Sequence, residues 1–136
     1  MRETKFHIAQ ILKEVCGALS GISENVTASN RFSAKQKQMK DFVVVSFPAS
    51  IPDGKVAQAT TLRIDLAARN TVNGLEDTPR LQEMLDGVTA LFPIHPSMRY
   101  SVTNPALMLK GDDGLGFSHW LVNADILINH TDSYKY

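Results

Sequence analysis

The chain has 136 residues, 43% of them hydrophobic, and its fourteen basic and fourteen acidic residues give a formal net charge of zero. A chain of this size predicts one domain, residues 1–136, with an ordinary hydrophobic core. Nucleic-acid binders need surplus Lys and Arg to displace counterions, and electrostatic membrane attachment needs a basic surface, so the charge balance argues against both.

The number of cysteines and the lengths of the apolar runs exclude further classes of protein. Cys16 is the single cysteine, which excludes an internal disulfide and a thiol-rich zinc site. No apolar run approaches the roughly 20 residues that cross a bilayer. The charged residues 1–5 lack the unbroken apolar stretch of a signal peptide. We therefore expect a protein that is made and used in a reducing cytoplasm.

The first predicted element is an amphipathic helix. One apolar stripe repeats at helical spacing and consists of Ile8, Ile11, Leu12, Val15, Cys16 and Leu19. Thr4 is the expected N-cap, and Gly21 can take the left-handed conformation that ends a helix. A helix this short is marginal alone, so it must pack its stripe on an apolar surface.

A polar segment follows, with a short strand predicted near Val26. Its second half is a basic, Gln-containing loop that carries Arg31, Lys35, Lys37 and Lys40. Such a loop is ordinarily solvated. The functional alternative is contact with an acidic protein surface or with DNA passing nearby, so these four residues are candidate partner contacts.

Two strands are predicted next. Residues 42–47 are rich in β-branched and aromatic side chains, and the unbroken apolar run suggests that both faces are partly covered. Residues 60–69 alternate, so that Leu62, Ile64 and Leu66 point inward while Arg63, Asp65 and Arg69 point to solvent or a partner. We expect the two strands to pair antiparallel across the Pro- and Gly-containing loop between them.

A second helix is predicted over residues 79–92. Asp77 or Thr78 is the expected cap, and Pro79 occupies the favoured first position. Its stripe consists of Leu81, Met84, Leu85, Val88, Leu91 and Phe92. Pro93 and Pro96 end it, and residues 98–102 are predicted to form a short strand.

The last third of the chain predicts a large β-hairpin. The apolar residues 105–109 lead into the Gly- and Asp-rich turn 110–116, and an alternating strand then runs from residue 117 to residue 129. One face of that strand carries Trp120, Val122, Ala124, Ile126 and Ile128. The other face carries His119, Asn123 and Asp125. We expect Asp112 and Asp113 to form a solvated tip, and we retain both as candidate partner contacts.

The order of elements predicts an α+β fold. The expected architecture is a mainly antiparallel sheet of four to five strands, with two helices on one face and a long C-terminal hairpin.

Catalytic and ligand chemistry finds little support in the sequence. The four histidines, His7, His95, His119 and His130, are scattered and match no metal-binding spacing. Cys16 lies on an apolar stripe, where a buried thiol is inert. Asp112 and Asp113 supply too few oxygens for calcium. We therefore expect no catalytic residue, no metal and no cofactor.

The order of these elements resembles the tail terminator, or tail completion, proteins of long-tailed bacteriophages and prophages. The matching pieces are residues 6–19, 42–48, 60–69, 79–92 and 111–129, which together span most of the chain. The similarity rests on this pattern and on no invariant motif. The polar segment at residues 33–40 departs from the family pattern.

The resemblance implies a structural role and no enzymatic activity. Members of that family cap the tail tube as a homo-oligomeric ring, usually a hexamer, and present a surface to the head connector. The implied partners are other copies of the chain, the tail tube protein and a head-completion or connector protein. The implied location is the host cytoplasm during assembly and then the virion tail.

Three alternatives remain open. One is another small phage neck or head–tail joining protein. A second is a bacterial α+β ligand-binding or enzymatic domain that uses His119, Asp125 or Cys16; a deep polar pocket joining His119 and Asp125 would favour it, although the two residues are too far apart along one strand for direct contact. The third is a bacterial protein-interaction module unconnected to phage.

Overall fold

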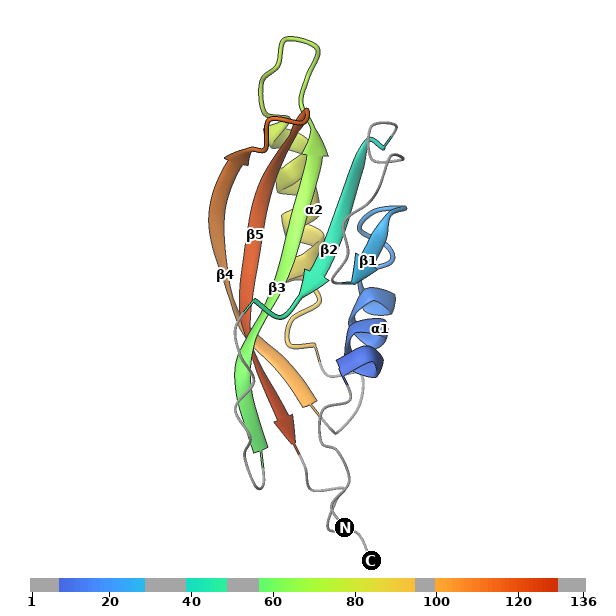
Figure 1. Cartoon of the computed structure of the whole chain (residues 1–136), viewed down its shortest axis with the longest axis vertical. Coiled ribbons are helices and arrows are strands. Elements are labelled where there is room, and N and C mark those ends of the chain that lie inside the picture. Colours follow the sequence, from blue (N-terminus) through green and yellow to red (C-terminus); the bar gives the residue numbers. More distant parts are fainter. Residues whose placement is uncertain (1–7, 29–38, 49–56, 95–99, 130–136) are drawn as a thin grey trace, which may run out of the picture.

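The computed structural model describes residues 8–28, 39–48, 57–94 and 100–129 of the chain. In chain order its elements are α1 (Ile8–Ala18), β1 (Val26–Ala28), β2 (Asp41–Ser46), β3 (Ala57–Arg69), α2 (Thr78–Thr89), β4 (Tyr100–Asp112) and β5 (Phe117–Asn129) (Figure 1). Two helices and a five-stranded, mostly antiparallel sheet confirm the predicted α+β class.

The strands lie in the order β1-β2-β3-β5-β4. The pairs β2–β3, β3–β5 and β4–β5 are antiparallel, whereas β1 pairs with β2 in parallel. The C-terminal strand β5 therefore lies inside the sheet, and the two edges are the three-residue β1 and the thirteen-residue β4. The predicted strand near Val26 and the predicted pairing of the two strands that follow it are both confirmed.

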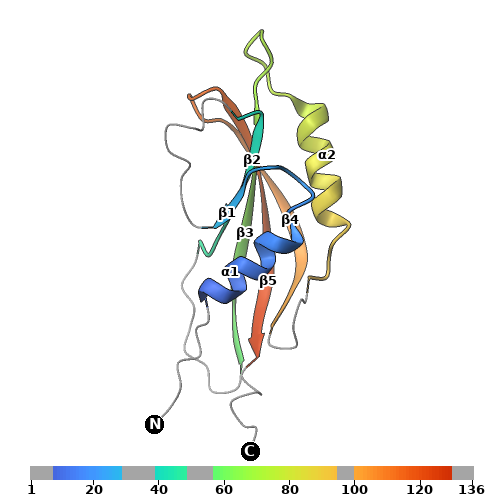
Figure 2. The same cartoon turned by 90° about the vertical axis from the view of Figure 1, so that its right-hand side faces the viewer.

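Both helices pack against the same face of the sheet. Figure 1 shows α2 behind the strands, and Figure 2 shows α2 running alongside them, with α1 crossing in front. One buried apolar cluster joins α1 and α2 to alternate residues of the strands. Its fully buried members include Val15, Leu62, Ile64, Leu66, Leu81 and Val88. On each strand, the residues that alternate with these buried residues point to the opposite side of the sheet, which we call the open face.

The second helix begins as its sequence predicts. The Asp77 side chain accepts a hydrogen bond from the Arg80 backbone amide at 3.2 Å, and Pro79 lies in the first turn, where it sacrifices no hydrogen bond. Leu81, Met84 and Val88 are buried, but Leu91 is 38% exposed and lies beyond the end of the helix. The predicted helix therefore extends too far, because the chain leaves the helical path before Pro93.

The two segments expected as separate strands before the hairpin tip are one strand, β4. The register of its pairing with β5 shifts between Thr103 and Ala106 and again between Leu109 and Gly111. Asn104, at the first shift, has a positive φ of 55° and precedes Pro105, which has no amide hydrogen to donate. Local irregularities of this kind hid a continuous strand from the alternation pattern. Met98, where the first segment was expected to begin, lies outside the described residues.

The open face carries a second, smaller apolar cluster. Phe42, Ala67 and Phe117 are buried there, with Met39 and Val44 packed beside them. The rings of Phe42 and Phe117 meet edge to face with centroids 5.0 Å apart. The apolar run of β2 thus has both faces at least partly covered, as predicted.

Candidate interaction surfaces and the His119 site

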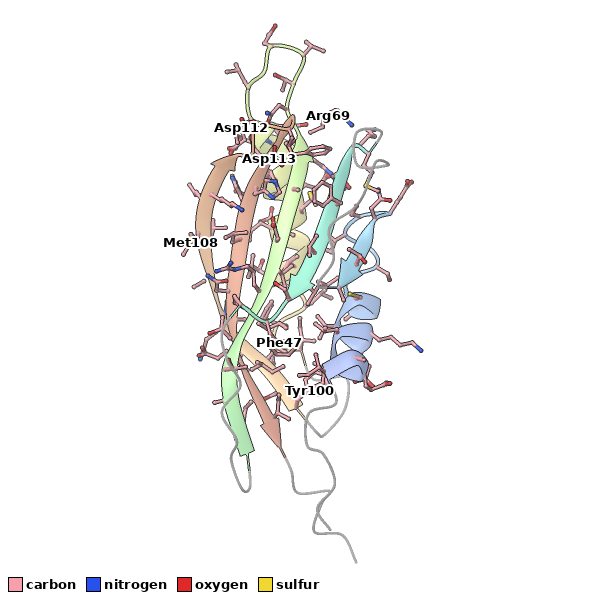
Figure 3. The ribbon with its side chains drawn as sticks, in the orientation of Figure 1. Phe47, Arg69, Tyr100, Met108, Asp112 and Asp113 are labelled. Atoms are coloured by element: carbon pink, nitrogen blue, oxygen red, sulfur yellow. The ribbon has the colours of Figure 1, made fainter. Side chains whose placement is uncertain are left out.

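An exposed apolar strand forms one edge of the sheet. We call Pro105 to Lys110 the β4 edge; every side chain in it is exposed. The exposed fractions reach 45% for Leu107, 51% for Met108 and 66% for Leu109. Leu107 and Leu109 lie beside Val122 and Trp120 on the helix side, while Met108 lies beside Leu121 on the open face. Figure 3 places Met108 at the outer border of the sheet.

An edge of this composition is unusual for an isolated domain. Natural edge strands are blunted by prolines, bulges and lysines, because unpaired backbone groups and apolar side chains recruit other strands. Pro105, Lys110 and the two register shifts are such devices, but they flank the apolar residues 107–109 and do not interrupt them. The opposite edge differs, since β1 has only three residues and all are half-buried.

A second exposed surface lies at one end of the sheet. The loop at residues 70–77 projects beyond the strands there, next to the tip of the β4–β5 hairpin (Figure 1). Val72 is fully exposed, Leu75 is 65% exposed, and Leu115 on the hairpin tip is 69% exposed. We call residues 71–76 and 113–116 the apical end.

Asn70 ties the loop and the hairpin of the apical end together. Its side-chain amide donates to Asp112 at 2.6 Å, and its side-chain oxygen accepts from the Ser118 hydroxyl at 2.6 Å. Its backbone amide donates to the carbonyl of Gly116 at 2.8 Å. The apical end is therefore held by polar contacts on both sides of Asn70.

A buried histidine lies below this end on the open face. His119 is 6% exposed. Its Nδ1 lies 2.8 Å from Oδ1 of Asp65 on β3, and its Nε2 lies 2.7 Å from Oδ2 of Asp113 at the hairpin tip. The Phe42 ring stands edge-on to the imidazole, with centroids 5.9 Å apart. The histidine thus bridges two carboxylates from different parts of the sheet.

This geometry favours the imidazolium form of His119. A carboxylate can only accept a hydrogen bond, so both ring nitrogens must carry a proton to donate to Asp65 and Asp113. Burial acts to lower the pKa of His119, but the hydrogen bonds to the two carboxylates and their negative charges outweigh it. The pKa of His119 is consequently raised above its ordinary value of 6.5.

Asp113 also organises the turn in which it lies. Its Oδ1 accepts hydrogen bonds from the backbone amides of Leu115 at 2.7 Å and Phe117 at 3.2 Å. Burial acts to raise the pKa of Asp113, but the bond from His119 and the two amide bonds outweigh it, so the pKa is lowered. The prediction of a solvated tip is therefore wrong for Asp113, whose side chain is only 14% exposed, whereas Asp112 is exposed. Figure 3 shows both at this end of the sheet.

The remaining predicted partner contacts fall in different places. Arg31, Lys35 and Lys37 lie outside the described residues. The Lys40 side chain is exposed, and the Lys40 carbonyl accepts a hydrogen bond from the Arg69 amide at 2.8 Å. Lys40 follows Met39, which packs against the apolar cluster of the open face. The Arg69 guanidinium lies 4.9 Å from the centroid of the Phe117 ring in that cluster.

The residues considered for an enzymatic alternative are not brought together. The Asp125 carboxylate accepts a hydrogen bond from the side-chain amide of Asn104 at 2.9 Å, whereas His119 contacts Asp65 and Asp113. Cys16 lies on α1, on the helix side of the sheet, and burial raises the pKa of its thiol. His7, His95 and His130 lie outside the described residues.

Sequence reasoning missed the association of Asp65, His119 and Asp113. The outward position of Asp65 was predicted correctly, and so was the face of His119. Their proximity depends on the register of β3 against β5, in which His119 lies opposite Ala67, two residues from Asp65. No local pattern in the chain specifies that register.

Two further properties concern only the described residues. No group of three or more His, Cys, Asp or Glu side chains there is placed to hold a metal ion. Neither of the two helices has the length and apolar character needed to cross a lipid bilayer.

Comparison with known proteins defines the fold and no more. No family model matches the chain, and no curated protein sequence matches it. One solved structure, whose name states no function, superposes with a TM-score of 0.60 at 11% sequence identity. The match covers 89% of this chain and 92% of the solved chain. The architecture thus recurs elsewhere, while the chain's own surfaces must indicate its function.

Proposed function

We propose that this chain is a structural assembly protein of a phage or prophage tail, which caps the tail tube as a ring of identical subunits and joins the tail to the head. The observation that carries the proposal is the β4 edge, where apolar side chains are exposed along the outermost strand of the described sheet. The order of elements resembles that of tail terminator proteins, and this resemblance is the reason for proposing a role in a phage tail.

The two edges of the sheet suit a ring better than a twofold pair. A ring needs a contact between two different patches of each subunit, so that every copy uses one patch on each neighbour. Here the long β4 and the short β1 lie at opposite sides of one sheet and differ in length and exposure. The zero net charge leaves little overall repulsion between copies to overcome.

The apical end is the proposed contact with the tail tube or the head connector. It projects beyond the strands, carries exposed Val72, Leu75 and Leu115, and is fixed at its base by Asn70. The basic candidates Arg31, Lys35, Lys37 and Lys40 and the exposed Asp112 remain candidate contacts within the same proposal. Assembly would take place in the host cytoplasm, before incorporation into the virion tail.

Electron microscopy of purified tail tubes mixed with the protein tests the proposal. We expect a ring of subunits at one end of each tube and arrest of further tube growth. Tubes that still lengthen without limit and carry no ring would contradict it. Binding to the connector without capping the tube would instead support a head–tail joining protein.

A matched pair of variants tests whether the β4 edge makes the ring. Leu109→Lys places a charge on the edge, whereas Leu127→Lys places one on β5, where the side chain is also exposed, at 48%. We expect only Leu109→Lys to abolish self-association in sedimentation velocity, with both variants remaining folded. Equal association of the two variants would remove the β4 edge from the interface.

A further inference from the structure

We infer that His119 is a proton-operated latch, which in its doubly protonated form holds the Asp113 carboxylate of the β4–β5 hairpin tip against β3 and on deprotonation releases that carboxylate. This inference does not rest on the proposed function, because it concerns the conformation of the tip in a single chain. It does, however, identify a way in which residues 113–116 of the apical end can loosen while the contacts of Asn70 remain.

His119 connects the hairpin tip to β3, a strand that is held by pairing on both sides. Asp65 belongs to the middle of β3, which pairs with β2 on one side and β5 on the other. Asp113 belongs to the turn between β4 and β5. Because His119 contacts one carboxylate from each, it joins the turn to the centre of the sheet.

Apart from His119, the turn is held by Asn70, which bonds to Asp112 and Gly116, and by the Asp113 amide, which donates to the Phe117 carbonyl at 2.9 Å. Gly111, Gly114 and Gly116 all adopt positive φ, at 89°, 78° and 99°, and glycine is the residue with the largest conformational freedom to lose on folding. The Asp113 carboxylate compensates by accepting bonds from the amides of Leu115 and Phe117. The position of that carboxylate therefore determines whether these two amides remain bonded.

Loss of the proton removes one of the two contacts. A neutral imidazole has one N–H donor and one lone pair, and the lone pair would face a carboxylate oxygen at hydrogen-bond distance. That contact is repulsive, so one carboxylate must move away. Asp65 lies in a strand paired on both sides, whereas Asp113 lies in a glycine-rich turn, so Asp113 is the one that yields.

Among the described residues, few charged side chains lie on the same face as His119. On the open face, β3 contributes Asp65, Arg63, which donates to Asn123 at 2.9 Å, and Arg69, which lies over Phe117. β2 contributes the uncharged Phe42 and Val44. β4 places Gly111 opposite His119, with the exposed Lys110 and Asp112 on either side. β5 itself adds Asn123 and the exposed Asp125 further along.

The pH range in which His119 holds Asp113 follows from the geometry and from the direction of both pKa shifts. The folded pKa of His119 is raised, so its contribution is fully present below the unfolded value of 6.5 and is lost as pH rises through the folded pKa. The folded pKa of Asp113 is lowered, so its contribution is present above the unfolded value of 3.8. The Asp113 carboxylate is held between these limits and is released on the alkaline side.

Nuclear magnetic resonance of the full chain tests the latch directly. Nitrogen-15 shifts should show both ring nitrogens of His119 protonated near neutral pH, with a transition above pH 6.5. Across that transition, the protection of the Leu115 and Phe117 amides against hydrogen exchange, corrected for intrinsic base catalysis, should fall about tenfold to a hundredfold. This is the change expected from losing a hydrogen bond to a charged group.

Two variants distinguish the effect of the His119 titration from a general loosening of the chain at alkaline pH. Asp125→Asn removes an exposed carboxylate from the same strand and face, and should leave the transition unchanged. Asp65→Asn should move it to lower pH, because one negative partner of the imidazolium is lost. A neutral His119 ring at pH 6 would overturn the inference. Tip protection that stays constant through the histidine titration would overturn it equally, and both measurements need only the unmodified chain.

Discussion

The guanidinium Nε of Arg80 donates to Oδ2 of Asp41 at 2.9 Å, and so joins the first turn of α2 to the first residue of β2. A second nitrogen of Arg80 donates to the carbonyl of Ile22 at 2.9 Å. The other carboxylate oxygen of Asp41 accepts from the Ser23 hydroxyl. The pKa of Arg80 is raised, chiefly by the bond to Asp41. One arginine thus connects α2, β2 and the turn before β1.

Replacing this arginine should destabilise the fold. Arg80→Ala leaves the mostly buried Asp41 carboxylate, 12% exposed, without its cationic partner, and it also frees the Ile22 carbonyl. Because the arginine side chain is 31% exposed and partly screened by solvent, we expect a loss of about 1–2 kcal/mol in the free energy of unfolding. Urea unfolding measures it. Glu83→Ala removes the exposed partner of Arg80 and should change stability by less than half as much.

Trp120 is a core residue of the helix side. It is 6% exposed, and its indole nitrogen donates to Glu76 at 3.2 Å. Trp120→Ala should cost about 3–5 kcal/mol and lower the melting temperature, because a large cavity replaces the ring. Thermal unfolding followed by circular dichroism checks this. An unchanged melting temperature together with lost assembly would instead identify Trp120 as an interface residue.

Tyr100 links β4 to α1. Figure 3 shows Tyr100 near α1. Its hydroxyl donates to Glu14 at 2.9 Å. Burial, followed by this bond and the charge of Glu14, raises the pKa of the phenol. Tyr100→Phe removes the hydroxyl but keeps the ring in the core, so we expect a loss of about 1 kcal/mol. Chemical denaturation of Tyr100→Phe, Glu14→Gln and the double variant should give a non-additive cycle. Strict additivity would show that the two side chains do not interact.

Asp113 should contribute to stability only above its lowered pKa. The contribution is present above the unfolded pKa of 3.8 and is lost as pH falls through the folded value. The stability difference between the unmodified chain and Asp113→Asn should therefore be largest near neutral pH and shrink in acid. Urea unfolding across an acidic pH series measures it. A stability difference that stays constant across the series would contradict a lowered pKa for Asp113.

The apical end should be dispensable for folding but needed for binding. Val72 and Leu75 are exposed, so Val72→Asp and Leu75→Asp should change the free energy of unfolding by less than about 0.5 kcal/mol. Under the proposed function, either change should weaken capping of tail tubes. Pull-down with purified tubes measures the effect. Normal capping by the double variant would assign the tube contact to another surface.

Much of this fold follows from local patterns in the chain. The stripes of α1 and α2, the Asp77 cap and the alternation of residues 60–69 and 117–129 identify the elements and their buried faces, because periodicity depends only on neighbours in the sequence. The α+β class follows from the order of those elements. The end of α2 was placed too late, and the irregularities around Asn104 divided β4 in two.

Only the tertiary structure decided which distant residues meet. Strand order and register bring Asp65, His119 and Asp113 together. Strand order also places residues 105–110 at an edge of the sheet. The sequence around these residues indicates neither arrangement. The sequence by itself determined which side of β3 and of β5 is buried. The neighbours across the sheet are determined by long-range pairing, which short-range periodicity does not encode.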